Sequence, residues 1–359
     1  MADIPANVTT KAVLEGLLPT GRSFSGVLDT AGDRDWIRVD GLEVGTDYYV
    51  NAHFLRAGSL TQGDVILRVY DADGNFLFQS DDRGGGVTPN AGTQFSIQQP
   101  GTYYIEVGAS GDNAAGSYSL HFGLVQGGTA KDLVGGDDDY TSNVASERVF
   151  GGYGNDTIGL GSSGFAAFGE QGDDTIFGNE AVNHIFGGLG GDYIQGGGGQ
   201  DWLFGDAGND TIYGGGSVND SADLIWAGIG NDDLHGGQGN DYLWGGQGQD
   251  DFWGDAGGDH FVFNLKSDSV KGANRDVIHD FVRFEDEIDL SAIDAKSGVG
   301  NHKFKWIGKQ GFHHKKGELH YVKKAGFVLV EGDVNGDAKA DFQIAVLGVT
   351  KLSGLDFDL

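Results

Sequence analysis

A nine-residue period runs through the middle of this chain and constrains its fold more than any other feature. From residue 151 to residue 262 the sequence divides into nonamers such as GGLGGDYIQ and GDAGNDTIY, with one thirteen-residue unit, GGGSVNDSADLIW, at residues 214–226. We number the nine positions of each nonamer as phases one to nine. Glycine dominates phases one, two and four, aspartate dominates phase six, and an apolar residue dominates phase eight. Because glycine permits positive φ and close backbone approach, each nonamer predicts a tight turn. A short strand follows, and its phase-eight side chain points inward. Two such units make one coil of a parallel β-helix.

The period also predicts which residues of successive coils lie side by side. With two nonamers per coil, residue i lies beside residue i+18, and the four inserted residues lengthen one step to 22. The phase-six residues then stack in two files. The first file is Asp156, Asp174, Asp192, Asp210, Asp232 and Asp250. The second file is Phe165, Asn183, Asp201, Asp223, Asp241 and Asp259. The phase-eight residues that should form the core are Ile158, Ala167, Ile176, Ile185, Ile194, Leu203, Ile212, Ile225, Leu234, Leu243, Phe252 and Phe261. A disordered or silk-like Gly/Asp tract would not keep both phases, so the pattern favours a folded roll.

The nonamer resembles the repeat of the RTX family of secreted calcium-binding proteins. The resemblance implies that Ca²⁺ ions bind between carboxylates of adjacent coils and carbonyls of the glycine turns, an all-oxygen environment that suits this ion. Each space between two successive aspartates of a file, here called a gap, is one candidate ion site. The first file has five such Asp–Asp gaps and the second has three, which together predict about eight ions. The gap between Asn183 and Asp201 is weaker, and Phe165 should leave its place empty. The implied carbonyl ligands are Gly152, Gly154, Gly172, Gly188, Gly190, Gly197, Gly199, Gly208, Gly228, Gly230, Gly237, Gly239, Gly246, Gly248 and Gly257.

The net charge of −30 is unevenly distributed along the chain. Residues 1–130 carry −8, residues 131–262 carry −21 and residues 263–359 carry −1, which predicts three domains with these boundaries. Eight ions would bring about +16 to the central domain, so neutralisation and folding are expected to be one event. The acidity argues against nucleic acids and anionic membranes as partners. No apolar run reaches the roughly 18 residues that a membrane span requires.

The flanks of the repeat suggest that the roll continues at both ends without its glycine turns. Asp138 with Tyr140, and Glu147 with Val149, fit the two files before the first nonamer. Asp268 with Val270 fits 18 residues after Asp250. We expect these segments to form capping coils, because stacked repeats need atypical ends.

The first third of the chain reads as short strands separated by turn signals, including DADGN between two apolar runs. This pattern predicts a β-sandwich. The pieces SGVLDTAGDRDWIRV, LRVYDADGNFLFQSDDRGGG and GTYYIEVGASGDNAAGSYSL resemble the bacterial pre-peptidase C-terminal (PPC) domain over most of residues 11–124. That family accompanies secreted peptidases and is not itself catalytic. The fold expected for the whole chain is therefore all-β: a β-sandwich, a parallel β-roll and a β-rich C-terminal cap.

Residues 263–359 resemble the C-terminal segment of serralysin-type secreted metallopeptidases, through RDVIHDFVRFEDEIDLSAIDA, EGDVNGDAKADFQIAVLG and the terminal LDFDL. A loop with Asp333, Asn335, Asp337 and Asp341 resembles a calcium loop, and a tight hairpin turn is the alternative. The ending DFDL resembles the uncleaved address of proteins exported by ABC-transporter (type I) secretion. The first ten residues lack the basic and apolar parts of a signal peptide, and cysteine is absent. We therefore expect a secreted, extracellular bacterial protein whose partners include the ABC-type export machinery.

No catalytic signature stands out in the sequence. H-E-x-x-H and G-x-S-x-G are both missing, and HHKKGELH at residues 313–320 favours a solvated hairpin over a zinc site. The expected function is a non-catalytic calcium-binding protein with a binding, adhesion or structural role. The alternative is the non-catalytic C-terminal portion of a serralysin-like metallopeptidase, or an unrecognised hydrolase. A cell-surface glycan or protein is a candidate partner, because the phase-nine residues Tyr213, Trp226, Trp244 and Trp253 either stack on sugars or pack against a neighbouring domain.

Overall fold

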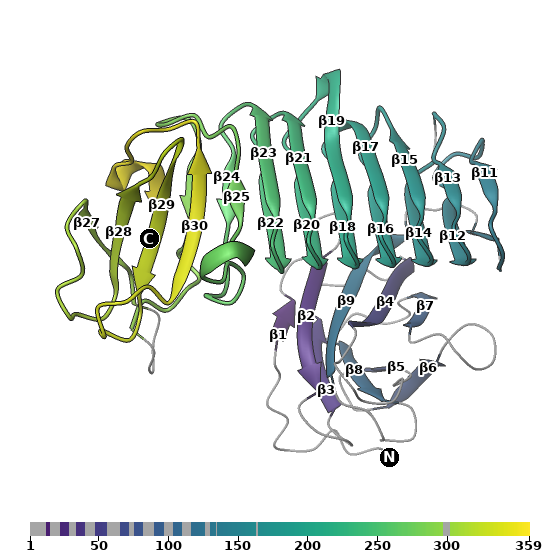
Figure 1. Ribbon diagram of the computed structural model, residues 1–359. Helices are drawn as coiled ribbons and strands as arrows, with labels where there is room; N and C mark the ends of the chain where they lie inside the picture. The colour runs from purple at the N-terminus through teal and green to yellow at the C-terminus, as the bar shows by residue number, and fades with distance from the viewer. Residues whose placement is uncertain are drawn as a thin grey trace. The chain divides into compact units, whose positions relative to one another are not determined.

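The structure, a computed structural model, is built almost entirely of β-strands, as predicted. It describes the strands within residues 12–125 with Asp71 and Asn75, and then residues 130–133, 135–162, 164–296 and 302–359. In these residues the helical segments are two single 3-10 turns, η2 (Gly272–Asn274) and η3 (Gly354–Asp356). No helix of the described residues is long and apolar enough to cross a lipid bilayer. The chain divides into two compact units at residue 128, each described below by itself (Figure 1).

The first unit contains two sheets whose strands are mainly antiparallel. One sheet has the order β1 (Ala12–Leu14), β3 (Arg34–Val39), β8 (Tyr103–Ala109), β5 (Val65–Tyr70) and β6 (Phe76–Asp81). The other has the order β2 (Arg22–Leu28), β9 (Gly116–Val125), β4 (Asp47–Leu55) and β7 (Asn90–Ser96). β1 and β3 pair in parallel, and the other pairs are antiparallel.

The hairpin predicted at DADGN joins β5 to β6. The carboxylate of Asp71 accepts hydrogen bonds from the backbone and side-chain amides of Asn75, at 2.8 and 2.9 Å. This is the turn geometry that aspartate favours. Residues 72–74 lie outside the described residues.

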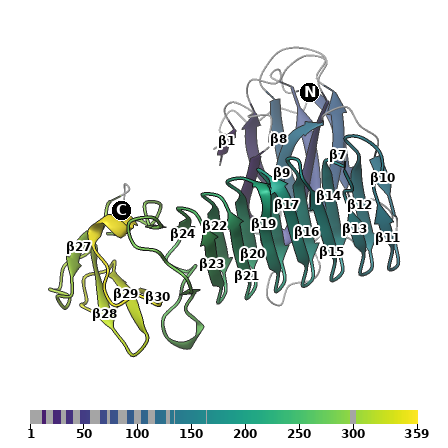
Figure 2. The same ribbon diagram turned by 90° about the horizontal axis from the view of Figure 1, so that it is seen from above.

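The second unit is a solenoid in which the even-numbered strands from β10 to β26 lie in one sheet and the odd-numbered strands from β11 to β25 lie in the other (Figure 2). The even sheet has the order β10 (Ala130–Asp132), β12 (Arg148–Tyr153), β14 (Ala166–Gln171), β16 (His184–Leu189), β18 (Trp202–Ala207), β20 (Leu224–Ile229), β22 (Tyr242–Gln247), β24 (His260–Val262), β26 (Glu287–Asp289) and β31 (Phe357–Asp358). The odd sheet runs β11 (Asp139–Thr141), β13 (Thr157–Gly159), β15 (Thr175–Asn179), β17 (Tyr193–Gly199), β19 (Thr211–Asp220), β21 (Asp233–Gln238), β23 (Asp251–Ala256) and β25 (Val277–Ile278), and then β30 (Phe342–Leu347), β29 (Phe327–Asp333), β28 (Glu318–Lys323) and β27 (Lys305–Gly308).

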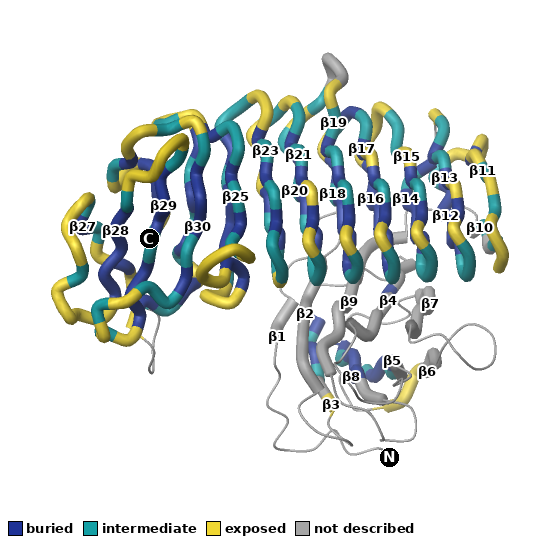
Figure 3. The backbone as a smooth tube through the Cα atoms, viewed as in Figure 1, coloured by how far each residue is buried: buried dark blue, intermediate teal, exposed yellow. Residues whose placement is uncertain are grey.

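The register of this roll is the predicted one. Ile158 pairs with Ile176, and Ile176 with Ile194, in parallel strands 18 residues apart. The thirteen-residue unit lengthens the step to 22, because Ile212 pairs with Leu234. All twelve phase-eight side chains are fully buried, and buried segments alternate with exposed turns along the roll (Figure 3). The hydrophobic prediction is confirmed at every phase-eight position.

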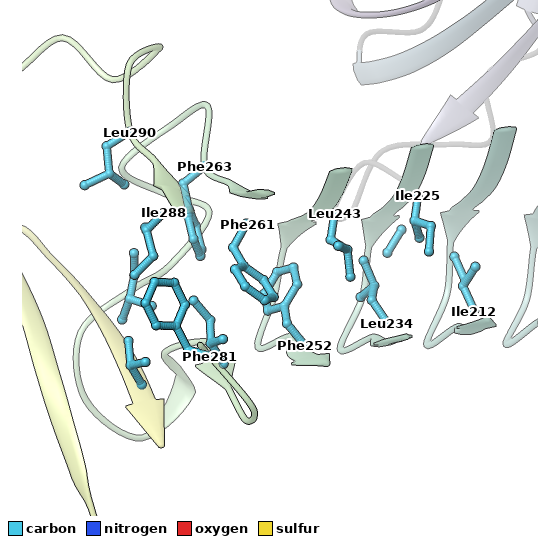
Figure 4. Close-up of a cluster of buried hydrophobic side chains, with 14 of the residues drawn as sticks. Ile212, Ile225, Leu234, Leu243, Phe252, Phe261, Phe263, Phe281, Ile288 and Leu290 are labelled. Atoms are coloured by element: carbon cyan, nitrogen blue, oxygen red, sulfur yellow. The ribbon is translucent and has the colours of Figure 1, made fainter. Parts of the chain in front are cut away.

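One hydrophobic core extends from the first coils of the roll to the end of the chain. Its inner side chains are aliphatic until Phe252 and Phe261, whose rings meet edge to face at 6.0 Å (Figure 4). Phe263 and Phe281 pack against these two rings, with centroids 5.8 and 6.0 Å away. These larger side chains fill the region where the roll meets the C-terminal strands. There, β28, β29 and β30 form an antiparallel meander, and β30 pairs in parallel with β25.

The predicted capping coils are right at one end and wrong at the other. Tyr140 pairs with Ile158 and Val149 with Ala167, as expected. Past Asp250, however, the next coil does not use Asp268 and Val270. The chain loops out, and the file resumes 26 residues later, where Asp276 bonds the amide of Asp250 at 3.0 Å.

Asp268 and Val270, which were expected in the next coil, lie outside the file and the core. Asp268 accepts hydrogen bonds from the amides of Asn264 and Leu265 in its own turn, and the Val270 side chain is exposed. The spacing rule failed here because the outward loop has no nonamer period, and the segment that can bury an isoleucine and pair with β23 comes later.

Candidate metal centre

The phase-six carboxylates form two continuous ladders along the turns of the roll. The Oδ1 atom of each aspartate accepts the backbone N–H of the phase-six residue in the preceding coil. In the first file this bond measures 2.7 Å from Asp156 to Asp174 and 2.8 Å from Asp192 to Asp210. The second file has the same contacts, with 2.7 Å from Asp201 to Asp223. The predicted stacking of both files is therefore present in the structure.

The second oxygen of most of these carboxylates is buried and receives no hydrogen bond from the described residues. The Oδ2 atoms in this state within the nonamers belong to Asp156, Asp174, Asp192, Asp201, Asp210, Asp223, Asp232, Asp241 and Asp250. All nine residues are at most 2% exposed. Buried acceptors without donors are costly, and charged ones more so. The ladders therefore require a positively charged partner or bound protons.

Seven of the nine free Oδ2 atoms lie beside a backbone carbonyl of the following coil. At Gly205 an added Cβ would lie 2.4 Å from Asp210 Oδ2 and 2.7 Å from the carbonyl oxygen of Ala227. These two oxygens therefore border one small space, which only glycine at position 205 leaves open. The same pairing of an aspartate Oδ2 with a phase-one carbonyl occurs beside Gly151, Gly169, Gly187, Gly196, Gly214 and Gly236.

Burial raises the pKa of these carboxyls well above the usual aspartate value. The pKa of Asp192, Asp223 and Asp232 rises to about 9, first through desolvation and then through the charges of neighbouring aspartates. The pKa of Asp174 and Asp210 rises to about 7, mainly through desolvation, which the hydrogen bond from the preceding coil partly offsets, as it does in the other three. Without cations the folded ladders hold protons near neutral pH. A bound divalent cation would replace these protons.

The donor set fits a hard divalent cation such as Ca²⁺. In the described residues, the turns beside the free Oδ2 atoms offer carboxylate and carbonyl oxygens, which are the ligands that Ca²⁺ prefers. Groups of three or more converging carboxylates or imidazoles do not occur among the described residues, so each site would rely on its carbonyls. When bound, the ion supplies charge neutralisation and cross-links adjacent coils.

The glycines named as carbonyl ligands occupy phases two and four. Phase two also accepts Glu170, Asp206 and Asp255 at positive φ, whereas phase four is the more restrictive position. Gly190 has φ +127°, and a Cβ there would lie 2.0 Å from the carbonyl oxygen of Gly172 in the coil before. Gly248 has φ +152°, and a Cβ would lie 1.4 Å from the Gly230 oxygen. Coils stack so closely here that no side chain fits. Metal binding by these carbonyls stays a prediction.

Two features of the turns were not predicted from the sequence. Phase-one carbonyls, such as those of Gly187 and Ala227, lie nearest the free Oδ2 atoms, and the small residues at phase one were the available signal. Phase five forms a further ladder, in which the Asn155 side chain accepts the Asp173 amide at 3.0 Å. Asn231 accepts the Gln249 amide at 2.9 Å in the same way. The recurrent Asn at phase five was visible in the sequence and satisfies backbone donors that would otherwise be orphaned.

The first file is longer than predicted, because one further aspartate joins it at each end. Asp276 extends the first file, is 1% exposed and has a free buried Oδ2. Its pKa rises to about 9, through burial and the charge of Asp250. Asp138 adds a member at the other end, because its amide donates to Asp156 Oδ1 at 2.8 Å.

The second file, by contrast, closes at both ends. The two oxygens of Asp286 accept the amides of Asp259 and Val282. At the other end, Asn183 Oδ1 accepts the amide of Asn179. Phe165 contributes a ring that lies 4.8 Å from that of His184. Neither end offers a free oxygen like that of Asp276.

The loop from Asp333 to Asp341 has the geometry of a tight turn. Asp333 accepts the amides of Gly336 and Ala338, at 2.6 and 2.9 Å. Asp341 accepts the amides of Val334 and Asn335 through Oδ2, and the Asn335 side chain through Oδ1. All four carboxylate oxygens of Asp333 and Asp341 thus accept hydrogen bonds from donors of the loop itself, which favours the hairpin turn over an ion site.

The histidine cluster at 313–320 spans the loop before β28 and the first residues of that strand. His313 Nδ1 lies 3.0 Å from Glu318 Oε1, whereas His320 turns to Glu331 at 2.9 Å and to the carbonyl of Gln310 at 2.7 Å. His313 and His320 therefore have separate carboxylate partners.

The phase-nine aromatic rings stack on one another along the roll. Trp253 lies between His235 and His279, with ring centroids at 4.4 and 4.1 Å and nearly parallel planes. Trp226 stacks on Trp244 at 4.9 Å, and Tyr213 stacks on His235 at 4.4 Å. Because both faces of Trp253 are covered, this ring has no free face for a sugar.

Together, these features define a parallel β-roll with stacked acidic turns. The sequence model of the family described as Peptidase M10 serralysin C terminal matches residues 134–357, and the chain belongs to this family. No curated protein gives a significant match.

Solved structures similar to this chain include the pre-peptidase C-terminal domain of a collagenase from Bacillus anthracis. It is 17% identical, with 32% of this chain and 95% of that chain covered and a TM-score of 0.25. Two subunits of the Azotobacter vinelandii mannuronan C5-epimerase AlgE6, R3 and R2, are 23% and 24% identical. Each match covers 50% of this chain, with 80% and 89% of the other chain covered and TM-scores of 0.21 and 0.25.

Proposed function

We propose that this chain is a secreted, non-catalytic calcium-binding protein whose roll folds when it meets extracellular Ca²⁺. The observation that supports this most directly is the file of buried aspartates whose Oδ2 atoms face carbonyls and receive no hydrogen bond. Without cations, folding of such a row requires its carboxylates either to keep protons, as their raised pKa values indicate, or to place like charges in successive coils. Ions that enter the turns neutralise the charge and hold the coils together.

The same chemistry suits export through an ABC transporter. Sites of the weak extracellular type stay empty at cytosolic calcium levels, so the acidic roll remains unfolded inside the cell. Outside, the C-terminal region meets calcium first and folds, and the coils behind it follow. The segment LDFDL at residues 355–359 resembles such an export address, and this role is part of the proposal.

The structure shows how the address can be tested without damaging the fold. Asp356 and Phe357 are buried, and Arg283 bonds Asp356 at 3.2 Å, so deletion of the last five residues would also disturb the cap. Leu355 is 79% exposed and Asp358 is exposed. Leu355→Ser with Asp358→Ser should keep calcium binding and reduce the amount of protein in the culture medium. Normal secretion of this variant without cell lysis would count against the address.

The absence of catalysis is part of the proposal, since the sequence contains neither H-E-x-x-H nor G-x-S-x-G. The family match favours one second candidate, that the chain is the non-catalytic C-terminal part of a larger secreted metallopeptidase. Sequencing the reading frame upstream of residue 1 and assaying the gene product on casein separates these two. Zinc-independent turnover of esters or glycosides would instead indicate an unrecognised hydrolase.

The decisive experiment compares two neighbouring aspartates. Asp232 is 1% exposed and belongs to the first file, whereas Asp233 is exposed at phase seven. Asp232→Asn and Asp233→Asn remove the same charge from adjacent positions. Circular dichroism during a Ca²⁺ titration from EDTA should show β-structure forming cooperatively. Asp232→Asn should need several-fold more Ca²⁺, and Asp233→Asn should match the wild type. A spectrum in EDTA identical to that in Ca²⁺ would refute calcium-driven folding.

A further inference from the structure

The C-terminal strands carry a concentrated basic surface in an otherwise acidic chain. Residues 302–324 contain seven lysines, no arginine and one acid, Glu318. The lysines are Lys303, Lys305, Lys309, Lys315, Lys316, Lys323 and Lys324, and all seven are exposed. We call them the lysine edge, because they lie on and around β27 and β28. β27 is the last strand of its sheet, and exposed segments surround it in Figure 3.

The carboxylates nearest the lysine edge already have other partners. Glu318 is 2% exposed, and its two oxygens contact the backbone amide and the ring of His313. Burial alone would raise its pKa, but His313 and the charge of Lys315 outweigh this and lower the pKa. Glu331 likewise bonds His320 and the side chain of Gln343.

No lysine of this edge forms an ion pair with an acid in the described ranges. Asp337, on the turn beside Lys315 and Lys316, accepts the backbone amide of Lys339. Asp294 pairs with His302 at 2.9 Å. Lys309 contacts the ring of Tyr321, with its Nζ 5.8 Å from the centroid. The ammonium charges are therefore available to an external anion.

The acidic roll is too distant to neutralise this edge. Five strand steps separate β23, which follows Asp250, from β27 in the order β23, β25, β30, β29, β28, β27. At a spacing of about 4.8 Å per step this is about 24 Å. The Debye length at physiological ionic strength is about 8 Å. The positive edge thus acts on its surroundings almost independently of the roll.

We propose that the lysine edge binds an acidic polysaccharide, a linear sugar polymer with carboxylate groups. Lysines act as separate, hydrated point charges, which suits anions spaced along a flexible chain, whereas arginine is favoured where phosphate is held by two parallel bonds. None of the exposed large apolar side chains belongs to residues 302–324 in the part of the chain that the structure describes. The edge therefore lacks the apolar anchors that reinforce attachment to lipid surfaces. This inference does not depend on calcium binding by the roll.

The test uses the full chain at fixed Ca²⁺ and polygalacturonate as the probe, with neutral dextran as the polymer control. Lys305→Gln with Lys315→Gln and Lys316→Gln removes three charges from the edge. A matched triple variant changes Lys266, Lys271 and Lys351 to Gln, which are exposed on the same unit outside the edge. We expect the edge variant to bind about tenfold or more weakly, and the matched variant within about twofold of wild type. Wild-type affinity should fall steeply as NaCl rises.

Three results would overturn the proposal. Equal loss in both triple variants would show that only net charge matters. Equal or tighter binding of phosphatidylglycerol vesicles or duplex DNA through the same lysines would assign the edge to another anion. Unchanged polysaccharide binding, with new self-association of the edge variant in sedimentation, would mean that the lysines only protect a sheet edge. Circular dichroism of each variant in Ca²⁺ separates these outcomes from a failure to fold.

Discussion

Gly205→Ala tests the proposed ion cradle without changing any charge. Gly205 does not have a positive φ, so alanine suits its backbone, and only space forbids a methyl group. The added Cβ would lie 2.4 Å from Asp210 Oδ2 and 2.7 Å from the Ala227 oxygen. Contacts of this length are about 1 Å too short, so the two oxygens must move apart and the space that they border is filled.

The expected loss follows from the affinity of one site. For a site of about 0.1–1 mM affinity, as in extracellular modules, about 10 mM Ca²⁺ stabilises the folded state by about 1.4–2.7 kcal/mol. Loss of this site lowers the melting temperature of a unit of this size by roughly 3–10 °C. The steric cost of the methyl group adds a further decrease that does not depend on Ca²⁺.

Thermal unfolding at several Ca²⁺ concentrations separates these two contributions. The slope of melting temperature against log[Ca²⁺] reports the number of ions bound, and it should decrease in Gly205→Ala. The matched control is Gly216→Ala, whose Cβ would meet nothing within 4 Å; its melting temperature and slope should equal those of the wild type. A wild-type slope in Gly205→Ala, even with a lower melting temperature, would refute an ion site between Asp210 and the Ala227 carbonyl.

Three further predictions concern the core, the file end and pH. Phe252→Ala should lower the free energy of unfolding in Ca²⁺ by about 3–5 kcal/mol in urea titrations. Phe284→Ala, with a side chain that is 64% exposed, should change this free energy by less than about 0.5 kcal/mol. Similar values for both variants would contradict the core assignment. Asp276→Asn should remove one Ca²⁺ in isothermal titration and speed proteolysis of the C-terminal strands, and an unchanged ion count would end the first file at Asp250. Burial raises the pKa of Asp232 from 3.8 to about 9, so the metal-free folded roll binds protons that the unfolded chain releases. Its stability in EDTA should therefore fall as pH rises from about 4 to 9, while Ca²⁺ affinity rises over that range. Circular dichroism and titration at pH 5, 7 and 9 check both signs, and opposite trends would contradict the pKa assignments.

The nine-residue repeat predicted most of the fold of the second unit and most of the candidate site. Its period determined the 18-residue register, the step of 22 between Ile212 and Leu234, and the burial of every phase-eight residue. It also placed the aspartates of the first file in successive coils. Such local, repeated contacts are predictable because each coil packs mainly against its neighbours.

The same rule failed where the period stops. Asp268 stands 18 residues after Asp250, yet Asp276 occupies the next position of the file. The loop from Asp333 resembles a calcium loop in composition, and the carboxylates of Asp333 and Asp341 accept amides of their own turn; ion binding there stays a prediction. In both cases the residue types were informative, but their partners depend on how the chain between them is folded.

The sequence by itself determined the solenoid, its core and the two files of carboxylates, because a strict period repeats one local solution along the chain. Only the tertiary structure decided which oxygen of each aspartate stays free and where the files end. It also placed the lysine-rich segment 302–324, whose composition the sequence already shows, at the edge of the C-terminal sheet. Those features arise from contacts between segments with no fixed spacing, such as β25 with β30 and β27 with β28. Such contacts are selected by burial and hydrogen bonding of the whole unit, and no local pattern in the sequence encodes them.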